Sequence, residues 1–554
     1  MYKASPADSM IVELWKKVYP SAAYTIGWPE YAGKLFIPSK ANVETALAEV
    51  KKIRKQIQND HQAKILDSIE LDLLFEEPQT IIEGIVGTIF NHLTKEGLNE
   101  DHMVSLVSNV IEALDASIER FKDKKVPTGV KVLTLYSLNG ILEILDVVKD
   151  QAKNQKLKSL CNVAKAKAAE FVSMFKVEGF TKGTYQEVRA IFEREKFDLG
   201  REKIYKDALK KWYDYDEGAE ELEQNALRWI QEELPMYREV IRQLSQLYSC
   251  EPAVDEVEKK IESRVRIEPA ELVQTTAAIR NVVQRFINEK IVRINPKYDT
   301  RLIETPSYLT GTLPTAAAGF FDSITEKPFQ LYFITTDRDR DPMKSLASII
   351  NTLVHEEYGH CVHHSNSSVG FVEELNILDL LPTSFQGPVS EGLAFNRELE
   401  FIHAIKELED NKELSAIERE YVNLMERYGG LHLCNLEVEY ETRKWRLIRF
   451  LRVVGDVRVN TGKQTLFEFI DWAHAYTGVP AANIYFQLFP AHESIGPGYA
   501  TCYAVVGEKI RELESRIKEK NRRIEFSTYL SSIGSPPTSI YRKKLEDYLK
   551  KIVA

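Results

Sequence analysis

Four of the 11 histidines in this chain, His355, His360, His363 and His364, lie within one stretch of ten residues. Neutral imidazole is a preferred zinc ligand, and one helix can direct two imidazoles at the same ion. The sequence from 355 to 360, HEEYGH, is close to the signature H-E-x-x-H. In that signature the glutamate activates a metal-bound water as a general base. The cluster therefore predicts a zinc site with hydrolytic chemistry.

The spacing of the two outer histidines departs from that signature, because His355 and His360 are five residues apart rather than four. On a regular α-helix this spacing places them about 140° apart, too far to share an ion. A π-bulge absorbs one extra residue, and such bulges are frequent at functional sites. Gly359 makes local irregularity less costly. We therefore expect a π-bulge near Glu357 to Gly359.

Two glutamates compete for the role of general base. Glu356 follows the first histidine directly, as in the signature, whereas Glu357 has the expected distance from His360. We favour Glu356 and keep Glu357 as the alternative. His363 and His364 are expected to line a cleft or to form local hydrogen bonds. The competing interpretation of the cluster is a helix with surface or core histidines and a chance glutamate.

A catalytic zinc site needs a third protein ligand and leaves one position open for water. Downstream of the histidines, the spacing alone does not choose among four glutamates: Glu373, Glu374, Glu391 and Glu398.

The elements that would position the histidines can be followed backwards along the chain. Residues 329–336, FQLYFITT, are aromatic and β-branched and predict a strand. The charged run after them ends in Asp341-Pro342, which predicts a helix start. Apolar residues then recur at helical spacing up to Leu353. We expect a strand from Tyr332 to Thr335 above the zinc, with Tyr332 at a site for an extended peptide.

The composition excludes several classes of protein. The chain has 554 residues, 44% of them hydrophobic and 28% charged, and a formal net charge of −10 with both signs mixed throughout. No basic stripe suggests a nucleic-acid partner. The N-terminus lacks the apolar stretch of a secretory signal, and no run is long enough to span a membrane. Five scattered cysteines do not suggest a disulfide framework, which favours a cytoplasmic location.

Helical periodicity dominates the chain, and its length predicts two or three core units. We divide it into an N-terminal helical region at 1–197, a catalytic zinc hydrolase region at 198–531, and a linker with a C-terminal helix at 532–554.

The motifs together resemble a known family. HEEYGH followed by SEGLAFNRELE is similar to the gluzincin metallopeptidases, and more specifically to domain-of-unknown-function family 885. That family has HExxPGHH, then EGWALYAE, a segment R-x-x-x-D, and PG-x-A-x-x-Y-x-x-G. The corresponding residues, over roughly 200 to 550, are His355, Glu356, Gly359, His360, Glu391, Gly392, Ala394, Arg452, Asp456, Pro497, Gly498, Ala500, Tyr503 and Gly507.

The resemblance implies an α-rich, peptidase-like fold with a helix-borne zinc site, and it selects Glu391 as the third ligand. Two departures are present. The family proline before Gly359 is missing, which affects the metal geometry. Asn460 stands where the family has a histidine, which affects substrate preference.

Two further residues of these motifs could act on a substrate. Tyr503, after the turn Gly496-Pro497-Gly498, could donate a hydrogen bond to a developing oxyanion. Arg452 could bind a substrate carboxylate through its planar fork. Arg452 and Asp456 are also four residues apart, so a structural ion pair on one helix is an equal alternative.

The combined prediction is a mainly α, two-lobed, metallopeptidase-like fold with a small β-sheet beside the active-site helix. His355, His360 and Glu391 would hold Zn²⁺, and Glu356 would take a proton from the bound water and pass it to the leaving amine of a peptide. The alternatives are a zinc amidohydrolase acting on a non-peptide amide, and a non-enzymatic helical binding protein with a degenerate metal site. The oligomeric state stays open.

Overall fold

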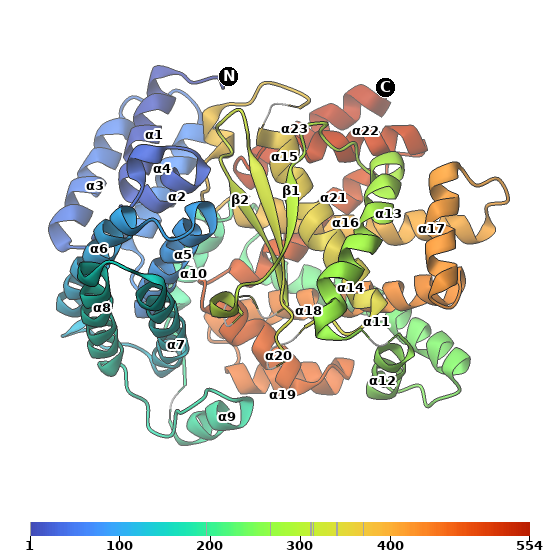
Figure 1. Ribbon diagram of the computed structural model, residues 1–554, viewed down its shortest axis with the longest axis horizontal. Coiled ribbons are helices and arrows are strands. Elements are labelled where there is room, and N and C mark those ends of the chain that lie inside the picture. The colour runs from blue at the N-terminus through green and yellow to red at the C-terminus, as the bar shows by residue number, and fades with distance from the viewer. Residues whose placement is uncertain are drawn as a thin grey trace.

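The protein is mainly helical and has one three-stranded sheet near its centre (Figure 1). The structure is a computed structural model that describes residues 2–195, 197–265, 267–310, 313, 315–338, 342–368 and 371–553. A mainly α fold with a small sheet was predicted, and this part of the prediction is confirmed.

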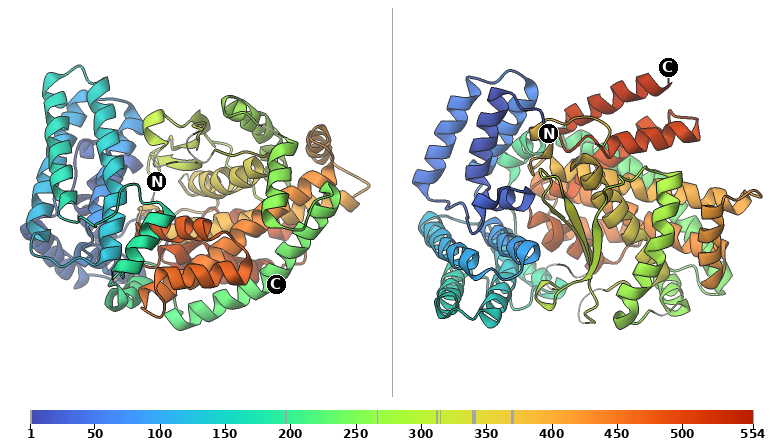
Figure 2. Two further views of the ribbon diagram at one scale, coloured as in Figure 1. Left: turned by 90° about the horizontal axis from the view of Figure 1, so that it is seen from below. Right: turned by 45° about the horizontal axis from the view of Figure 1, so that its top comes forward.

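The N-terminal third consists of helices that stand as a group at one side of the molecule (Figure 1 and Figure 2). Its first helices pack around one hydrophobic cluster, and most of its later helices pack around a second cluster that continues into the sheet. Its last helix contributes Val188 and Ile191 to the large core of the rest of the molecule. The elements are α1 (Pro6–Val18), α2 (Pro20–Ile26), η1 (Pro29–Tyr31), α3 (Lys40–Arg54), α4 (Asp60–Leu74), α5 (Pro78–Glu96), α6 (Glu100–Phe121), α7 (Thr128–Gln151), α8 (Gln155–Ser173) and α9 (Tyr185–Arg194).

The sheet has the strand order β1-β3-β2. The central strand β3 (Phe329–Ile334) runs parallel to β1 (Thr300–Glu304) and antiparallel to β2 (Ala316–Phe321). The predicted strand at 329–336 is thus confirmed in its start and in its aromatic, β-branched interior. It is paired along both edges, however, so its backbone has no free edge to offer to a peptide.

The remaining helices lie behind the sheet and on the side away from the N-terminal helices, and they form the larger part of the molecule (Figure 1). They are α10 (Glu202–Lys211), α11 (Ala219–Tyr248), α12 (Val254–Arg264), η2 (Pro269–Glu271), α13 (Leu272–Lys290), η3 (Ser307–Leu309), α14 (Leu346–Leu353), η4 (Val354–Cys361), α15 (Val362–Ser368), η5 (Ile377–Leu380), α16 (Gln386–Asp410), α17 (Ala416–Arg427), α18 (Leu431–Asn460), α19 (Leu466–Thr477), α20 (Ala481–Leu488), η6 (Phe489–Glu493), η7 (Tyr499–Thr501), α21 (Cys502–Glu514), α22 (Lys520–Leu530) and α23 (Thr538–Val553).

The helix that leads to the histidines begins later than predicted. Helix α14 starts at Leu346, after an N-cap at Ser345, and not at Pro342. The Ser345 side chain accepts a hydrogen bond from the Ser348 backbone, and the Ser348 side chain bonds back to the Ser345 backbone. This capping box satisfies two end groups that a helix otherwise leaves unpaired. Asp341, the predicted cap, lies outside the described residues.

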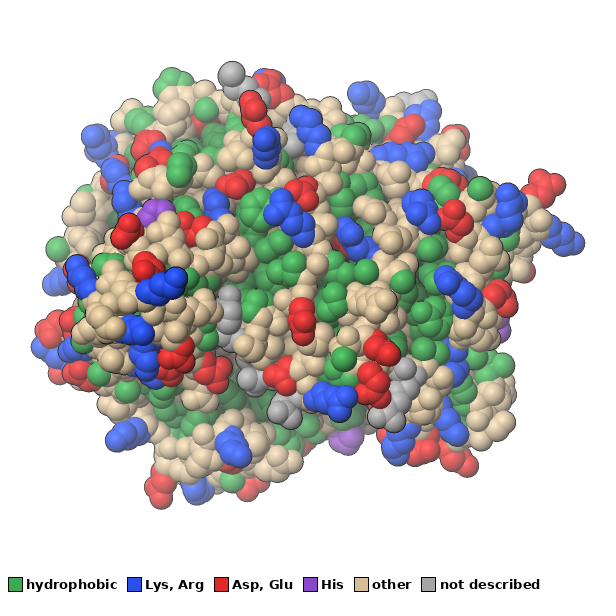
Figure 3. Space-filling view, in the orientation of Figure 1, with side chains coloured by type: hydrophobic (Ala, Val, Ile, Leu, Met, Phe, Trp, Pro, Cys, Tyr) green, Lys and Arg blue, Asp and Glu red, His purple; other side chains and the backbone are tan. Residues whose placement is uncertain are grey.

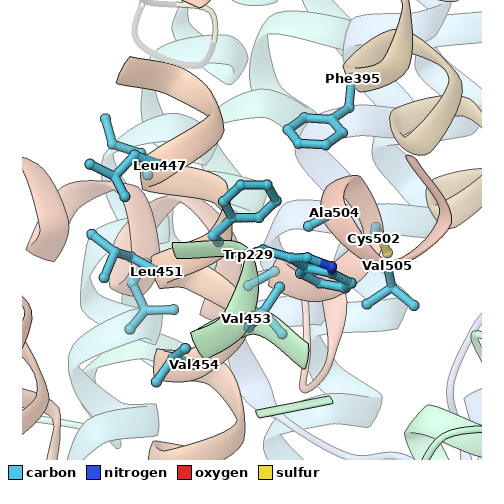
Figure 4. Packing of buried hydrophobic residues seen from close by; sticks show 14 of the residues in the cluster. Trp229, Phe395, Leu447, Leu451, Val453, Val454, Cys502, Ala504 and Val505 are labelled. Atoms are coloured by element: carbon cyan, nitrogen blue, oxygen red, sulfur yellow. The ribbon is translucent and has the colours of Figure 1, made fainter. Parts of the chain in front are cut away.

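Helices α11, α16, α18 and α21 pack together around a shared core (Figure 4). Phe395 of α16, Trp229 of α11 and Leu447 of α18 contribute to it. Helices α16 and α21 approach closely because glycines lie at their crossing. A Cβ atom on Gly392 would lie 2.9 Å from the backbone nitrogen of Gly507. This core holds α16 and α21, which carry residues of the site.

The segment predicted as a linker, 532–539, is packed inside the protein. Ser532 and Ile533 are fully buried, and the Gly534 backbone donates a 3.1 Å hydrogen bond to Ser367. The C-terminal helix α23 then begins at Thr538, slightly before the predicted start at Tyr541.

The surface carries acidic and basic side chains interspersed over the face shown in Figure 3, in keeping with the mixed charge pattern of the sequence. Among the described residues, no helix combines the length and the apolar character that crossing a bilayer would need.

Candidate metal centre

The four histidines lie on one continuous helical segment made of α14, η4 and α15. The middle part, η4, is a π-helix from Val354 to Cys361. The predicted π-type irregularity is therefore confirmed, and it covers more of the segment than a single bulge. Its wider turn brings residues five apart onto one side. The ring centres of His355 and His360 accordingly lie 4.9 Å apart.

Gly359 allows this segment to approach α16. A Cβ atom at this position would lie 2.5 Å from Ala394 Cβ and 2.7 Å from Ala394 Cα, which is closer than real atoms come. The absence of a side chain is thus required by the packing. The close approach places Glu391, one turn before Ala394 on α16, opposite the two histidines.

Glu391 faces both histidines. Its Oε2 atom lies 3.4 Å from His355 Nε2 and 3.3 Å from His360 Nε2. The three potential ligand atoms all lie within 4.8 Å of one another. Of the other glutamates that the sequence left open, Glu373 and Glu374 are exposed. The fourth, Glu398, contacts the far side of His355.

Both imidazoles are held from behind. His355 Nδ1 lies 2.8 Å from Glu398 Oε1, and Arg449 Nη1 donates to both oxygens of Glu398 at 2.8 and 2.7 Å. His360 Nδ1 lies 2.8 Å from the Ser390 hydroxyl. Carboxylate or hydroxyl partners of this kind fix the tautomer and orientation of metal-binding histidines.

The site strongly favours positive charge. Burial and Arg449 act to lower the pKa of His355, but Glu391 and Glu398 outweigh them and raise it to about 9. Burial acts to raise the pKa of Glu391, yet His360 and His355 hold it well below its ordinary value. Each of these groups therefore keeps its charged form only because of the other.

The two adjacent glutamates have different surroundings. Glu357 is fully buried and accepts hydrogen bonds from Arg280 Nε at 2.8 and 2.7 Å and from the Tyr298 hydroxyl at 2.8 Å. Glu356 is partly exposed and lines the same cavity as His355, His360 and Glu391. The geometry thus leaves Glu356, and not Glu357, facing the potential ligands.

His363 and His364 form local hydrogen bonds, as predicted. His363 Nε2 lies 3.1 Å from the Gly534 carbonyl oxygen. His364 contacts Ser323 and Gln330 at 2.6 and 2.8 Å and stacks on Phe320. Burial lowers the pKa of His363 to about 4 and that of His364 to about 3, so both are neutral at pH 7.

The ligand atoms open onto a cavity of about 1010 Å³. One side of the cavity is formed by η4, α16 and the edge strand β2. The opposite side is formed by residues of the N-terminal helices and of the segment after α10. The volume lies in the range of sites for small organic ligands.

Tyr503 and Arg452 lie next to each other beside this cavity. The Arg452 guanidinium lies 5.0 Å from the centre of the Tyr503 ring, and its Nη1 lies 2.9 Å from His492 Nε2. The Tyr503 hydroxyl lies 3.4 Å from the same His492 nitrogen. The alternative pairing of Arg452 with Asp456 is wrong, because Asp456 instead accepts hydrogen bonds from the Gly498 backbone and Tyr205.

Tyr332 is not at a substrate site. Its side chain is 0% exposed, because it belongs to the central strand β3 and points into a hydrophobic cluster. The strand beside the cavity is β2, where Ala316, Ala317 and Ala318 contribute to the wall. The prediction failed because a strand signal does not say whether the strand is central or at an edge.

Sequence reasoning missed several residues of the site. Arg449, His492 and Tyr499 come from α18, η6 and η7, and Tyr499 donates a 3.3 Å hydrogen bond to Glu391 Oε1. One signal for the role of Glu398 was available. Glu398 follows Glu391 by seven residues, so the two share one face of α16.

No family model and no curated protein matches this sequence. Two solved structures share its fold over nearly the whole chain. The putative lipoprotein from Colwellia psychrerythraea has a TM-score of 0.64 and 14% identity, and the match covers 98% of both chains. A putative lipoprotein of unknown function from Shewanella oneidensis has a TM-score of 0.62 and 17% identity, and the match covers 98% of this chain and 100% of that one.

These comparisons correct the predicted function. Neither neighbour is described as a hydrolase or a peptidase, and one is described as being of unknown function. The prediction of a zinc-dependent peptidase is therefore not retained, nor are its two alternatives, the amidohydrolase and the degenerate binding protein. The predicted hydrolase and protease activity is withdrawn with it, whereas the resemblance to gluzincin metallopeptidases is not tested by these neighbours.

The predicted cytoplasmic location is corrected as well. Both neighbours are putative lipoproteins, and a lipid anchor holds a protein at a membrane rather than free in the cytoplasm. The scattered cysteines and the N-terminal sequence, on which that prediction rested, do not decide the compartment for this fold.

Proposed function

We propose that this protein binds one divalent metal ion, zinc, through His355 Nε2, His360 Nε2 and Glu391. The observation that carries the proposal is the convergence of these three ligand atoms within 4.8 Å of one another at the wall of a large cavity. Two imidazoles and one carboxylate form a donor set that zinc prefers.

The hydrogen bonds around the site support a cation at this point. Glu398 is bound to Arg449 and, as a carboxylate, only accepts hydrogen bonds, so the Nδ1 atom of His355 carries the proton. In the neutral imidazole, the lone pair of Nε2 then points toward Glu391 Oε2. That oxygen is buried and has no hydrogen-bond partner among the described residues. Without a metal ion, a proton on His355 Nε2 would occupy the 3.4 Å gap between these two atoms, in agreement with the raised pKa of His355, and a zinc ion would take the place of that proton.

When bound by His355, His360 and Glu391, zinc would supply a Lewis acid at the wall of the cavity. Glu356 lines that cavity and could hold or pass a proton there, and the Tyr503 hydroxyl could donate a hydrogen bond. These roles of Glu356 and Tyr503 stay predictions, as do the likeness to metallopeptidase folds, the resemblance to family 885, a peptide partner and enzymatic turnover.

The proposal is tested by the metal content of the purified protein, measured by mass spectrometry after dialysis against zinc. We expect about one zinc per chain. His355→Ala, His360→Ala and Glu391→Gln should each lose the ion. Two matched controls should retain it: Glu356→Gln, which neutralises the neighbouring carboxylate, and His364→Ala, which removes an imidazole from the same helix. Wild-type protein without stoichiometric zinc, or an unchanged content in Glu391→Gln, would contradict the proposal.

A further inference from the structure

The cavity wall opposite the metal ligands carries a carboxylate among aromatic rings. Asp72 on α4 and Tyr19, between α1 and α2, form part of this wall together with Phe75, Trp212 and Tyr213. Asp72 is partly exposed, and it lines a second, smaller cavity as well. We call these five residues the aromatic wall.

Among the described residues, Asp72 forms no ion pair with a cationic side chain. It accepts a short hydrogen bond from the Tyr19 hydroxyl. The Trp212 indole N–H lies near enough to lower the pKa of Asp72, although the contact between them does not meet the geometry of a hydrogen bond. Within the described part of the chain, no Lys, Arg or His forms an ion pair with Asp72 or contributes to its electrostatics.

The other carboxylates at the cavity wall, Glu356 and Glu391, lie close to the two histidines. Burial acts to raise the pKa of each carboxyl group, and the histidines act to lower it. Glu391 faces two histidines, and Glu398, behind His355, is bound by Arg449. Asp72 differs because burial raises its pKa to about 6 and, within the described residues, no positively charged group acts against this. At pH 7 and above it is charged and incompletely solvated, so a cation placed beside it would be favoured.

The rings next to Asp72 suit a cation too. Phe75 and Trp212 meet edge to face at 4.9 Å, and Trp212 lies 6.4 Å from Tyr213. Aromatic faces attract ammonium groups through their quadrupoles, and tryptophan does so most strongly. A carboxylate framed by such rings is the usual chemistry of ammonium recognition in proteins.

We propose that the aromatic wall is the binding site for the ammonium group of an organic amine ligand. Asp72 accepts its N–H hydrogen bonds, and the rings of Tyr19, Phe75 and Trp212 surround it. The wall belongs to the same cavity as the metal ligands, so the rest of the ligand would extend toward them. The site goes beyond the proposed zinc centre and does not depend on it.

The test compares two ligands that differ in charge and little else. Benzylammonium and benzyl alcohol are titrated into the full-length protein at pH 8 by calorimetry, once after zinc loading and once after treatment with a chelator. We expect benzylammonium to bind about tenfold more tightly than benzyl alcohol, the difference typical of a charge-assisted hydrogen bond. The preference should be present in both states. Its persistence in zinc-free protein separates this site from the metal centre.

Asp72→Asn should remove the preference and leave the affinity for benzyl alcohol unchanged. Asp101→Asn, at an exposed position on α6, is the matched control and should keep it. Trp212→Leu is an independent variant. It should weaken the binding of benzylammonium and leave that of benzyl alcohol unchanged. Equal affinities for the two ligands in the wild-type protein, or a preference that survives Asp72→Asn, would overturn the proposal and leave Asp72 as the structural partner of Tyr19.

Discussion

Two clusters of carboxylates are buried between helices, and they differ in where their positive charge comes from. In the arginine cluster, Arg201 donates to Glu77 at 2.7 Å and to Glu493 at 2.6 Å. Asn460 bridges Glu493 and Asp456 at 3.1 and 3.2 Å. In the metal-ligand cluster, Glu391 faces the two histidines and the Tyr499 hydroxyl, and an imidazole carries positive charge only when it is protonated.

The arginine cluster contains a permanent cation of its own, Arg201. Burial raises the pKa of Asp456 to about 6 and that of Glu493 further, because the two acids lie together and share a proton. With that proton, two negative charges remain, and they meet one guanidinium and a set of hydrogen bonds. In the metal-ligand cluster the permanent cation, Arg449, is bound to Glu398 behind His355 and not to Glu391. Under the proposal made above, a zinc ion would supply the positive charge that faces Glu391.

The largest effect is expected at Arg201. Arg201→Met should lower the free energy of unfolding by about 3–5 kcal/mol, because it leaves Glu77 and Glu493 buried without a counter-charge. Chemical denaturation measures this loss. Arg285→Met, in an ion pair whose side chains are about half exposed, is the control and should cost at most about 1 kcal/mol. Similar losses in both variants would mean that burial does not distinguish the two ion pairs.

Zinc should stabilise the protein by a comparable amount. At a free concentration about a thousand times the dissociation constant, a ligand that binds only the folded state adds about 4 kcal/mol. We expect this gain in denaturation curves of the wild-type protein and none for Glu391→Gln. If zinc stabilised both proteins equally, the ion would be bound elsewhere, and the contrast between the two clusters would fail.

The clusters also show which parts of the structure the sequence could predict. The π-helix followed from the five-residue spacing of His355 and His360, which is local information. The third ligand did not follow from spacing, because Glu391 reaches the site through the crossing of two helices at Gly359 and Ala394. Arg201 and Glu493 are 292 residues apart, and nothing in the local pattern of either residue indicates the other.

The same distinction explains the wrong predictions. Tyr332 was assigned correctly to a strand, but the pairing of that strand depends on segments elsewhere in the chain. The helix start was placed at Pro342, because Asp-Pro is a good local signal, whereas the capping box of Ser345 and Ser348 determines the actual start. Local patterns gave the elements, and long-range packing decided which side chains face the cavity.

A smaller effect is expected at Glu398, which supports a ligand without being one. Glu398→Gln keeps the shape but weakens the hold on His355 Nδ1 and leaves Arg449 without its carboxylate. Changes to such supporting groups typically reduce metal affinity about 10- to 100-fold. Competition with a zinc chelator measures the change. Ser390→Ala, behind His360, provides the comparison, since its neutral hydroxyl should matter less. An unchanged affinity in Glu398→Gln would show that the orientation of His355 does not limit binding.

Asp72 is an intermediate case, a partly exposed carboxylate with a hydroxyl partner but no cation, and it gives the smallest and most pH-dependent effect. Its folded-state pKa of about 6 lies above the ordinary value of about 3.9, so the protonated form favours folding. With Asp72 protonated, below about pH 4, the free energy of unfolding has its full value, and it decreases as Asp72 loses its proton and the pH rises through about 6.

Asp72→Asn removes this decrease and should therefore raise the free energy of unfolding at pH 8. The full shift would correspond to about 3 kcal/mol, and solvent screening at this partly exposed site reduces the expected gain to about 1–2 kcal/mol. At pH 4 the two proteins should differ little, and Asp101→Asn should show no such trend. A variant that is less stable than the wild type at pH 8 would show that the hydrogen bond from Tyr19 outweighs the cost of the unpaired charge.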